Sequence, residues 1–387
     1  MSFIITLLAA VFVFSAVIAI HEFGHFAVAK LCGVQVNEFS IGMGPVLLKK
    51  TQNGTQYSLR ALPVGGFVAL EGEESPESQQ AEKGERPDAE PQTPPPCADA
   101  DGSPDDGGAG NEEAPAQPVG KPLNEAAVWQ RALIMAAGAF MNFLLGFVVM
   151  VILIAAQSEP ITSRVIYAID DGALCGQTGL EAGDKVLAVN GRRCFVANDM
   201  LYELMRTEDY SARFTVLRGG EKVELPCVRF DTWQDDSGET HMSLGFTVYG
   251  IRKTPANVVK EAWNSVLYYG RIIFTSLMDL LRGRESINDL SGPVGIVTAI
   301  GQAASYGWQD LLELLVLITV NLGIFNLLPF PALDGGKVVF LLIEGVTGHA
   351  VPEKIQSGLT LAAFALLFAL MIFATYNDIV RLVTGAI

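Results

Sequence analysis

The chain has 387 residues, of which 50% are hydrophobic and only 18% charged, and its mean hydropathy is +0.34. This composition excludes an ordinary soluble domain and favours an integral membrane protein with soluble parts. The net charge of −16 is concentrated between residues 71 and 120, where fourteen Asp and Glu stand against two basic residues. The rest of the chain is nearly neutral, so no nucleic-acid partner is indicated.

The first element is a charge-free run from Ser2 to Ile20, followed directly by the box His21-Glu22-Phe-Gly-His25. The run is about long enough to span a bilayer, and no Lys or Arg precedes Lys30, so we expect a retained membrane helix over residues 1–30 rather than a signal peptide. Two histidines four residues apart lie on one helix face and can both bind Zn²⁺, which leaves Glu22 as a base. Ionisable residues at bilayer depth are costly and indicate function, here proteolysis of a substrate held within the membrane.

Residues 31–71 contain rough alternation and turn residues around Gly54 and Pro63, which predict a membrane-associated β-hairpin. On these residues alone, a hairpin beside the His box and an unrelated surface hairpin are both open. Residues 72–124 form an acidic, Pro-rich insert, and nine of the 19 prolines lie between residues 71 and 120. Such a segment cannot bury enough apolar surface to offset its ordering entropy, so we expect a disordered linker.

A second membrane helix is predicted over residues 130–157, and residues 158–250 alternate strands with turns. The run Gly179-Leu-Glu-Ala-Gly-Asp184 and the turn Asn190-Gly191 in this region resemble a PDZ domain. PDZ domains bind extended peptides by adding a strand to a sheet edge, so a peptide ligand is expected, with a plain spacer domain as the alternative. A disulfide between Cys194 and Cys227 is conceivable but not favoured.

Residues 254–306 predict amphipathic linker helices, because Thr254 suits an N-cap and Pro255 a first helical position. Arg271 and Asp279 interrupt the apolar face and exclude a membrane span there. Membrane helices are predicted over residues 310–345 and 357–380. The expected fold is therefore a multi-pass α-helical membrane protein, with about four transmembrane helices and an inserted small β-rich PDZ-like domain.

The third membrane helix holds Asn326-Leu-Leu-Pro329-Phe-Pro331-Ala-Leu-Asp334. Two prolines break the helix, and a carboxylate after such a break is costly unless it is paired or bound to metal. A catalytic zinc takes three protein ligands, and the remaining histidines, His241 and His349, lie in soluble segments. Asp334 is therefore the predicted third ligand. A capping Asp before Gly-Gly is the alternative.

Together these motifs resemble the site-2 protease family of intramembrane zinc metalloproteases, and within it the bacterial regulator-of-sigma-E protease type. The resemblance rests on the His box, the PDZ-like domain and the run from Asn321 to Asp334. Gly138-Ala-Phe-Met-Asn142 and Ser291-Gly-Pro-Val-Gly295 match further family segments. The family usually has Pro at one of the two positions after Gly138, and its better-known members carry two PDZ domains where this chain shows one.

The resemblance implies a Zn²⁺-dependent endoprotease that cuts single-span membrane proteins, such as anti-sigma factors or remnant signal peptides, in or near their membrane-spanning segments. It also implies a multi-pass protein of the bacterial plasma (inner) membrane, with the active site toward the cytoplasm and the PDZ-like domain outside. Basic residues flanking the first two spans support this orientation: Lys30, Lys49, Lys50, Lys121 and Arg131.

In the implied mechanism Glu22 takes a proton from a zinc-activated water and passes it to the leaving amine. Three asparagines, Asn321, Asn326 and Asn142, either hold the unwound substrate backbone or tie helices together. Two other classes of protein are less consistent with the sequence. An inactive scaffold would not need the complete set of catalytic residues, and a transporter would not explain the His box.

Overall fold

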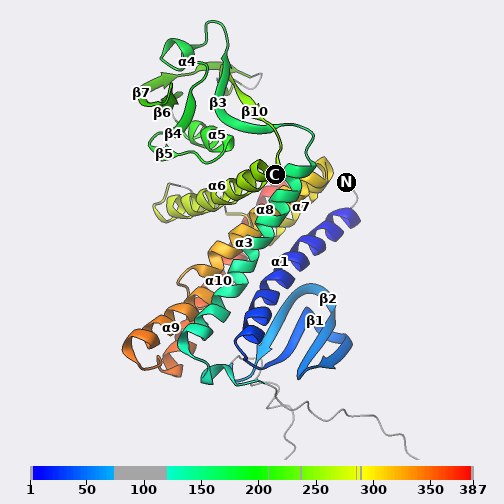
Figure 1. Cartoon of the computed structure of the whole chain (residues 1–387). Helices are drawn as coiled ribbons and strands as arrows, with labels where there is room; N and C mark the ends of the chain where they lie inside the picture. The colour runs from blue at the N-terminus through cyan, green and yellow to red at the C-terminus, as the bar shows by residue number, and fades with distance from the viewer. Residues whose placement is uncertain are drawn as a thin grey trace, which may run out of the picture.

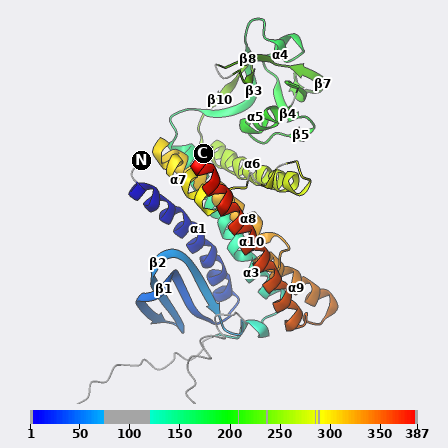
Figure 2. The same cartoon turned by 180° about the vertical axis from the view of Figure 1, so that it is seen from behind.

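The computed structural model describes residues 3–73, 120–207, 209–235, 238–284, 286–287 and 290–384. Most of the predicted acidic insert, residues 74–119, lies outside these ranges. Long helices form an elongated bundle, with a β-hairpin against one end and a small β domain beyond the other (Figures 1 and 2). The first helix begins, and the last one ends, on the side of the β domain.

Within the described residues, four helices are long and apolar enough to cross a membrane: α1 (Phe3–Leu31), α3 (Val128–Ala156), α8 (Trp308–Leu327) and α10 (Glu353–Thr384). The predicted number of membrane helices is thus confirmed by length and composition. Helix α3 is central, because it contacts α1, α8 and two further helices described below. Buried side chains such as Val13, Met150 and Val316 form the core of the bundle. By contrast, α10 buries only a few side chains.

The contact between α1 and α3 depends on a glycine. A Cβ atom at Gly24 would lie 2.5 Å from the carbonyl oxygen of Ala137, much closer than a van der Waals contact allows. The absence of a side chain at Gly24 therefore lets the backbones of the two helices approach closely. This approach brings the His box against α3.

The hairpin consists of β1 (Val36–Gln52) and β2 (Thr55–Leu70), joined by a turn in which Asn53 and Gly54 both have positive φ. Positive φ at both central residues matches the type I′ turn that the twist of a hairpin favours. Both strands bend, so residues 38–41 of β1 pair with residues 56–59 and also with residues 66–69 of β2. The last part of β2 is consequently an edge strand, and β2 packs on α1.

The inserted β domain contains β3 (Ile161–Ile169), β4 (Lys185–Val189), β6 (Ser211–Arg218), β7 (Glu221–Arg229) and β10 (Phe246–Ile251), in the order β10-β3-β4-β6-β7. Strand β5 (Arg192–Arg193) pairs with β4, and β8 (Asp231–Gln234) pairs with β9 (Thr240–Ser243). Helices α4 (Leu174–Gln177) and α5 (Ala197–Met205) complete the domain around a core that includes Phe214. The expected small β-rich insertion is confirmed. Its cysteines Cys194 and Cys227 are both free thiols, so the conceivable disulfide is not formed.

Helix α6 (Pro255–Leu281) lies across the bundle, between it and the β domain (Figure 1). Thr254 caps it as expected, because its hydroxyl accepts a hydrogen bond from Asn257 N at 3.2 Å. The charges that interrupt its apolar face bind the β domain, since Arg271 pairs with Asp199, and Asp279 with Arg206. The linker continues with α7 (Pro293–Tyr306), whose N-terminus is held by the buried Asp378 of α10.

A short 3₁₀ turn, η1 (Leu123–Glu125), precedes α3, and helix α9 (Asp334–Thr347) follows α8. The predicted break after α8 is present, because α8 ends at Leu327 and the chain is extended at Leu328. The helices that contact α3, besides α1 and α8, are α6 and α9. Helix α3 therefore adjoins both segments that carry the predicted metal ligands.

Candidate metal centre

His21 and His25 lie one turn apart on the same side of α1. Their rings are 4.8 Å apart between centroids and nearly perpendicular, at 84°. The two Nε2 atoms are 3.2 Å apart. Both residues are buried, with 8% and 9% of their surface exposed. The pair therefore directs two ring nitrogens to a common point inside the protein.

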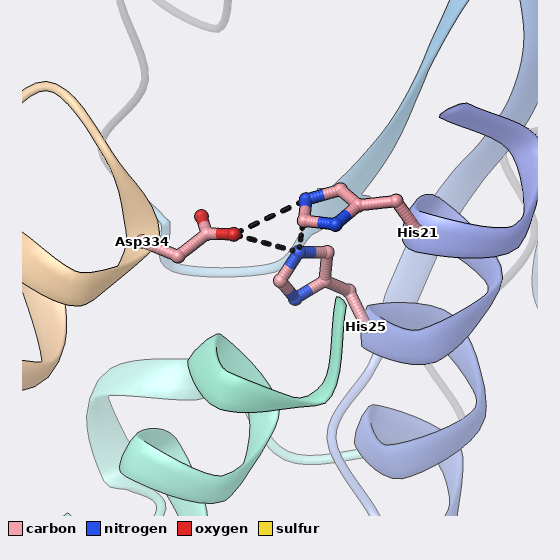
Figure 3. A group of neighbouring side chains, drawn as sticks. All are labelled: His21, His25 and Asp334. Carbon is pink, nitrogen blue, oxygen red and sulfur yellow. Dashed lines mark hydrogen bonds and ion pairs between the residues drawn. The ribbon is translucent and has the colours of Figure 1, made fainter. Parts of the chain in front are cut away.

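Asp334 reaches this point because the chain folds back tightly after α8. Phe330 N donates to Leu328 O at 2.7 Å, and Leu333 N donates to Phe330 O at 2.9 Å. The first turn of α9 packs directly on this loop, since a Cβ at Gly335 or Gly336 would lie only 2.2 or 2.3 Å from a loop carbonyl oxygen. Only glycines allow this packing, which turns the Asp334 carboxylate toward the two imidazoles (Figure 3).

The distances among the three side chains fit a zinc site. Asp334 Oδ2 lies 3.2 Å from His21 Nε2 and 3.3 Å from His25 Nε2. Ligand bonds of about 2.0–2.1 Å in tetrahedral geometry place neighbouring ligand atoms about 3.3–3.4 Å apart. Asp334 Oδ2 is also buried and accepts no hydrogen bond from the described residues. A cation between the three atoms would compensate this carboxylate oxygen.

Polar groups from two further helices surround the histidines. His25 Nδ1 lies 2.7 Å from Ile134 O, and His21 Nδ1 lies 3.2 Å from the amide Nδ2 of Asn142, both on α3. The Nδ2 of Asn326, on α8, lies 3.4 Å from His21 Nε2. Polar groups therefore contact both ring nitrogens of His21 and the Nδ1 of His25.

Glu22 lies between the two histidines in sequence and is half-buried. Its neighbour across the site is β2, because a Cβ at Gly66 would lie 3.5 Å from Glu22 Cγ. The hairpin therefore forms one wall beside the metal centre. Of the two alternatives left by the sequence, the hairpin beside the His box is the one observed.

The structure brings together His21, His25, Asp334, Asn142 and Asn326, but Asn321 is exposed on α8 with no hydrogen bond to this cluster among the described residues. The other histidines lie elsewhere. His241 pairs with Asp235 at 3.0 Å in the β domain, where Glu239 completes an open acidic group, and His349 contacts the backbone of Thr347.

Sequence reasoning missed three contributions to the site. Ile134 takes part through its backbone carbonyl, which has no sequence signature. Gly138 gives room to both imidazoles, because a Cβ there would lie 2.4 Å from His25 Nε2. Lys337, one turn after Asp334, forms an ion pair with Glu73 at 2.7 Å. The sequence offered one signal for this part of the site: Gly138 and Asn142 are four residues apart, which places them on the same face of a helix.

Comparison with known proteins gives one family. The model of peptidase family M50 matches residues 9–370. A putative zinc metalloprotease of Clostridium perfringens is 30% identical, over 96% of this chain and 97% of its own length. The regulator of sigma-W protease RasP of Bacillus subtilis is 29% identical, over 98% of this chain and 99% of its own length. A putative zinc metalloprotease of Clostridium acetobutylicum is 31% identical, over 96% of both chains.

Proposed function

The chain belongs to peptidase family M50 and is a zinc metalloprotease, and from this premise we propose that it hydrolyses peptide bonds in or near the membrane-spanning segments of membrane proteins. The observation that carries this proposal is the position of the His box. His21 and His25 lie inside α1, a helix that is long and apolar enough to cross a membrane. A protease site within such a helix meets substrates at the membrane.

We propose that His21 Nε2, His25 Nε2 and Asp334 Oδ2 hold the zinc, as their mutual distances of 3.2–3.3 Å support. When bound, zinc lowers the pKa of a water molecule and polarises the scissile carbonyl. Glu22 would then take a proton from the attacking water on its carboxylate and deliver it to the leaving amine. Asn326 lies beside His21, so its amide is suited to bind a substrate backbone carbonyl.

A substrate helix must unwind before cleavage, because its carbonyls are engaged in internal hydrogen bonds. The hairpin supports binding of such an extended segment. Residues 66–70 of β2 pair with β1 on one side only and adjoin Glu22 through Gly66. An extended substrate could add a strand at this edge and present its backbone to the metal centre.

The names of the relatives support a proposal for the substrate class. One of them is named a regulator of sigma-W protease, and we propose that this chain likewise cuts a single-span membrane protein, such as an anti-sigma factor or a remnant signal peptide. We propose that the β domain acts as a PDZ-like peptide-binding module. Strand β10 is at a sheet edge. The domain also has a pocket of about 380 Å³ between residues of α5 and β9, lined by residues that include Leu201, Leu204, Met205, Met242 and Leu244.

We propose that the hairpin end of the bundle faces the cytoplasm of a bacterium and that the β domain is outside. The basic residues Lys30, Lys49, Lys121 and Arg131 all belong to the segments at the hairpin end. Cytoplasmic loops carry an excess of Lys and Arg near membrane helices, whereas long translocated domains do not follow this rule.

The test uses the purified full chain in detergent with a single-span model substrate. Glu22→Gln should keep one zinc per chain and abolish cleavage, because Gln preserves the shape but cannot accept the proton. Asn326→Ala should also keep zinc and weaken cleavage. Substantial turnover by Glu22→Gln would reject the base assignment, and wild-type protein that binds no zinc would reject the proposed site as a whole.

A further inference from the structure

Three residues at four-residue spacing on α3 meet the histidine pair. Ile134 contacts His25, Gly138 faces both rings, and Asn142 contacts His21. Residues four apart lie above one another on one face of a helix. One stripe of α3 therefore forms the seat for both imidazoles.

The contact with Ile134 defines the protonation of His25. A carbonyl oxygen can only accept a hydrogen bond, so at 2.7 Å the Nδ1 of His25 must carry the proton and donate it. The neutral ring then has its lone pair on Nε2, the atom directed at Asp334. This is the tautomer that a metal ligand requires.

If His21 is to bind a metal through Nε2, the contact with Asn142 must likewise keep the proton of His21 on Nδ1. The side-chain amide has two orientations of nearly identical shape. With Nδ2 toward His21, the ring proton is forced onto Nε2, and the buried Oδ1 of Asn142 finds no hydrogen-bond partner among the described residues. With the amide reversed, Oδ1 accepts a hydrogen bond from Nδ1, and Nε2 keeps its lone pair for a metal ion.

The burial of Asn142 is consistent with a contact to His21 and not with a contact to substrate. The exposed fraction of Asn142 is 0%, and its backbone carbonyl accepts a hydrogen bond from Thr319 Oγ1 of α8 at 3.1 Å. The residue is thus enclosed between helices and turned toward the back of His21, away from the side on which Asp334 approaches. A substrate on the Asp334 side has no access to it.

We infer that Asn142 is a positioning residue of the metal centre: its carbonyl oxygen fixes the tautomer and orientation of His21, as the Ile134 carbonyl does for His25. The inference rests on the proposed function in one respect, the assignment of His21 as a zinc ligand. It replaces the substrate-binding role that the sequence left open for Asn142. Helix α3, which supplies no zinc ligand, thereby determines how the ligands of α1 are presented.

The test measures zinc affinity by competition with a chelator, using the full-length protein in detergent and no substrate. Asn142→Leu keeps the size of the side chain but removes the acceptor, and should weaken zinc binding by about 10–100-fold, the usual effect of losing such a partner. Asn142→Asp keeps an acceptor at the same place and should stay within about tenfold of wild type. Thr319→Val is the matched control, because it removes a buried hydroxyl group at the same helix contact without touching His21, and should leave zinc affinity unchanged.

Activity separates the competing roles. If Asn142 positions His21, the activity lost in Asn142→Leu should return when zinc is raised above the new dissociation constant. Unchanged zinc affinity in Asn142→Leu with a raised KM would overturn the inference and restore a substrate contact. Equal losses of affinity in Asn142→Leu, Asn142→Asp and Thr319→Val would show a merely structural effect and also overturn it. In each case wild-type zinc binding and cleavage still test the proposed function separately.

Discussion

Replacing Gly138 by alanine is the most direct steric test of the metal centre. The new Cβ would lie 2.4 Å from His25 Nε2 and 2.5 Å from His21 Cε1. An ordinary contact needs about 3.4 Å, so a ring would have to retreat by about 1 Å, or α3 would have to move. Zinc sites tolerate deviations of only about 0.2 Å in ligand distance. A retreat of this size would remove one imidazole from the ligand set.

We therefore expect Gly138→Ala to weaken zinc binding by at least about 100-fold, which corresponds to about 2.7 kcal/mol. The added methyl group should also cost the zinc-free protein about 1–3 kcal/mol, the usual effect of overpacking. Zinc content after dialysis against graded chelators measures the first effect. Thermal unfolding with and without zinc measures the second, since a ligand that binds only the folded state raises Tm.

Gly146→Ala is the matched control on the same helix. Its Cβ would meet only side-chain methyl groups of α8, at 3.0 Å from Val320 and 3.2 Å from Thr319, and no histidine. It should therefore change stability slightly and zinc affinity not at all. Full zinc occupancy of Gly138→Ala under chelator conditions that wild type just withstands would refute the proposed ligand geometry.

Three further predictions concern other parts of the chain. Asp334→Asn should lower zinc affinity and cleavage together, and a variant that kept full zinc affinity would exclude Asp334 as a ligand. Burial raises the pKa of the Cys194 thiol to about 12, so at pH 8 this thiol stays protonated and should resist alkylation in the native protein, whereas the exposed Cys227 should react. Peptide mass mapping measures the labelling of both cysteines. Labelling of Cys194 in the native protein would contradict the structure. Deleting residues 75–117 should leave a folded, zinc-loaded protein, because Gln35 accepts hydrogen bonds from Glu71 N and Gly120 N, on the two flanks of the segment. Loss of zinc or of membrane insertion on deletion would show that the segment is structural.

The sequence predicted those parts of the fold and site that depend on local pattern. The His box needs only the four-residue spacing of a helix, and membrane helices are indicated by length and composition alone. Asp334 was predicted by elimination, and the structure brings it to 3.2 and 3.3 Å from the two ring nitrogens. A buried carboxylate after a proline break needs a charged partner, so Asp334 could be linked to the two histidines although about 300 residues separate them in the sequence.

Features that depend on packing between helices could not be predicted. The role of Gly138 is set by what α1 places opposite it, and a backbone carbonyl such as that of Ile134 is the same in every sequence. The hairpin was expected, but the lengths of its strands were not. Strands β1 and β2 have 17 and 16 residues, and bends at positions such as Gly42 and Gly65 interrupt the alternation that reveals strand length. Asn321 was grouped with Asn326 although five residues on a helix separate side chains by about 140°.

The charges of α6 show how one sequence feature can serve two purposes. Arg271 and Asp279 interrupt the apolar face of α6, and both are paired with the β domain, the first as cation and the second as anion. Because the pairs have opposite polarity along the helix, turning the domain around would bring like charges together. The Asp199 and Asp279 carboxylates are almost fully buried, so each depends on its arginine partner, and Asp279 has a second partner in Arg284 at 3.6 Å. Helix α6 thus fixes the domain at the end of the bundle opposite the hairpin and the His box (Figure 1). From that position none of the domain's described residues contributes a side chain to the metal centre, so we expect the domain to influence cleavage through the access of substrates.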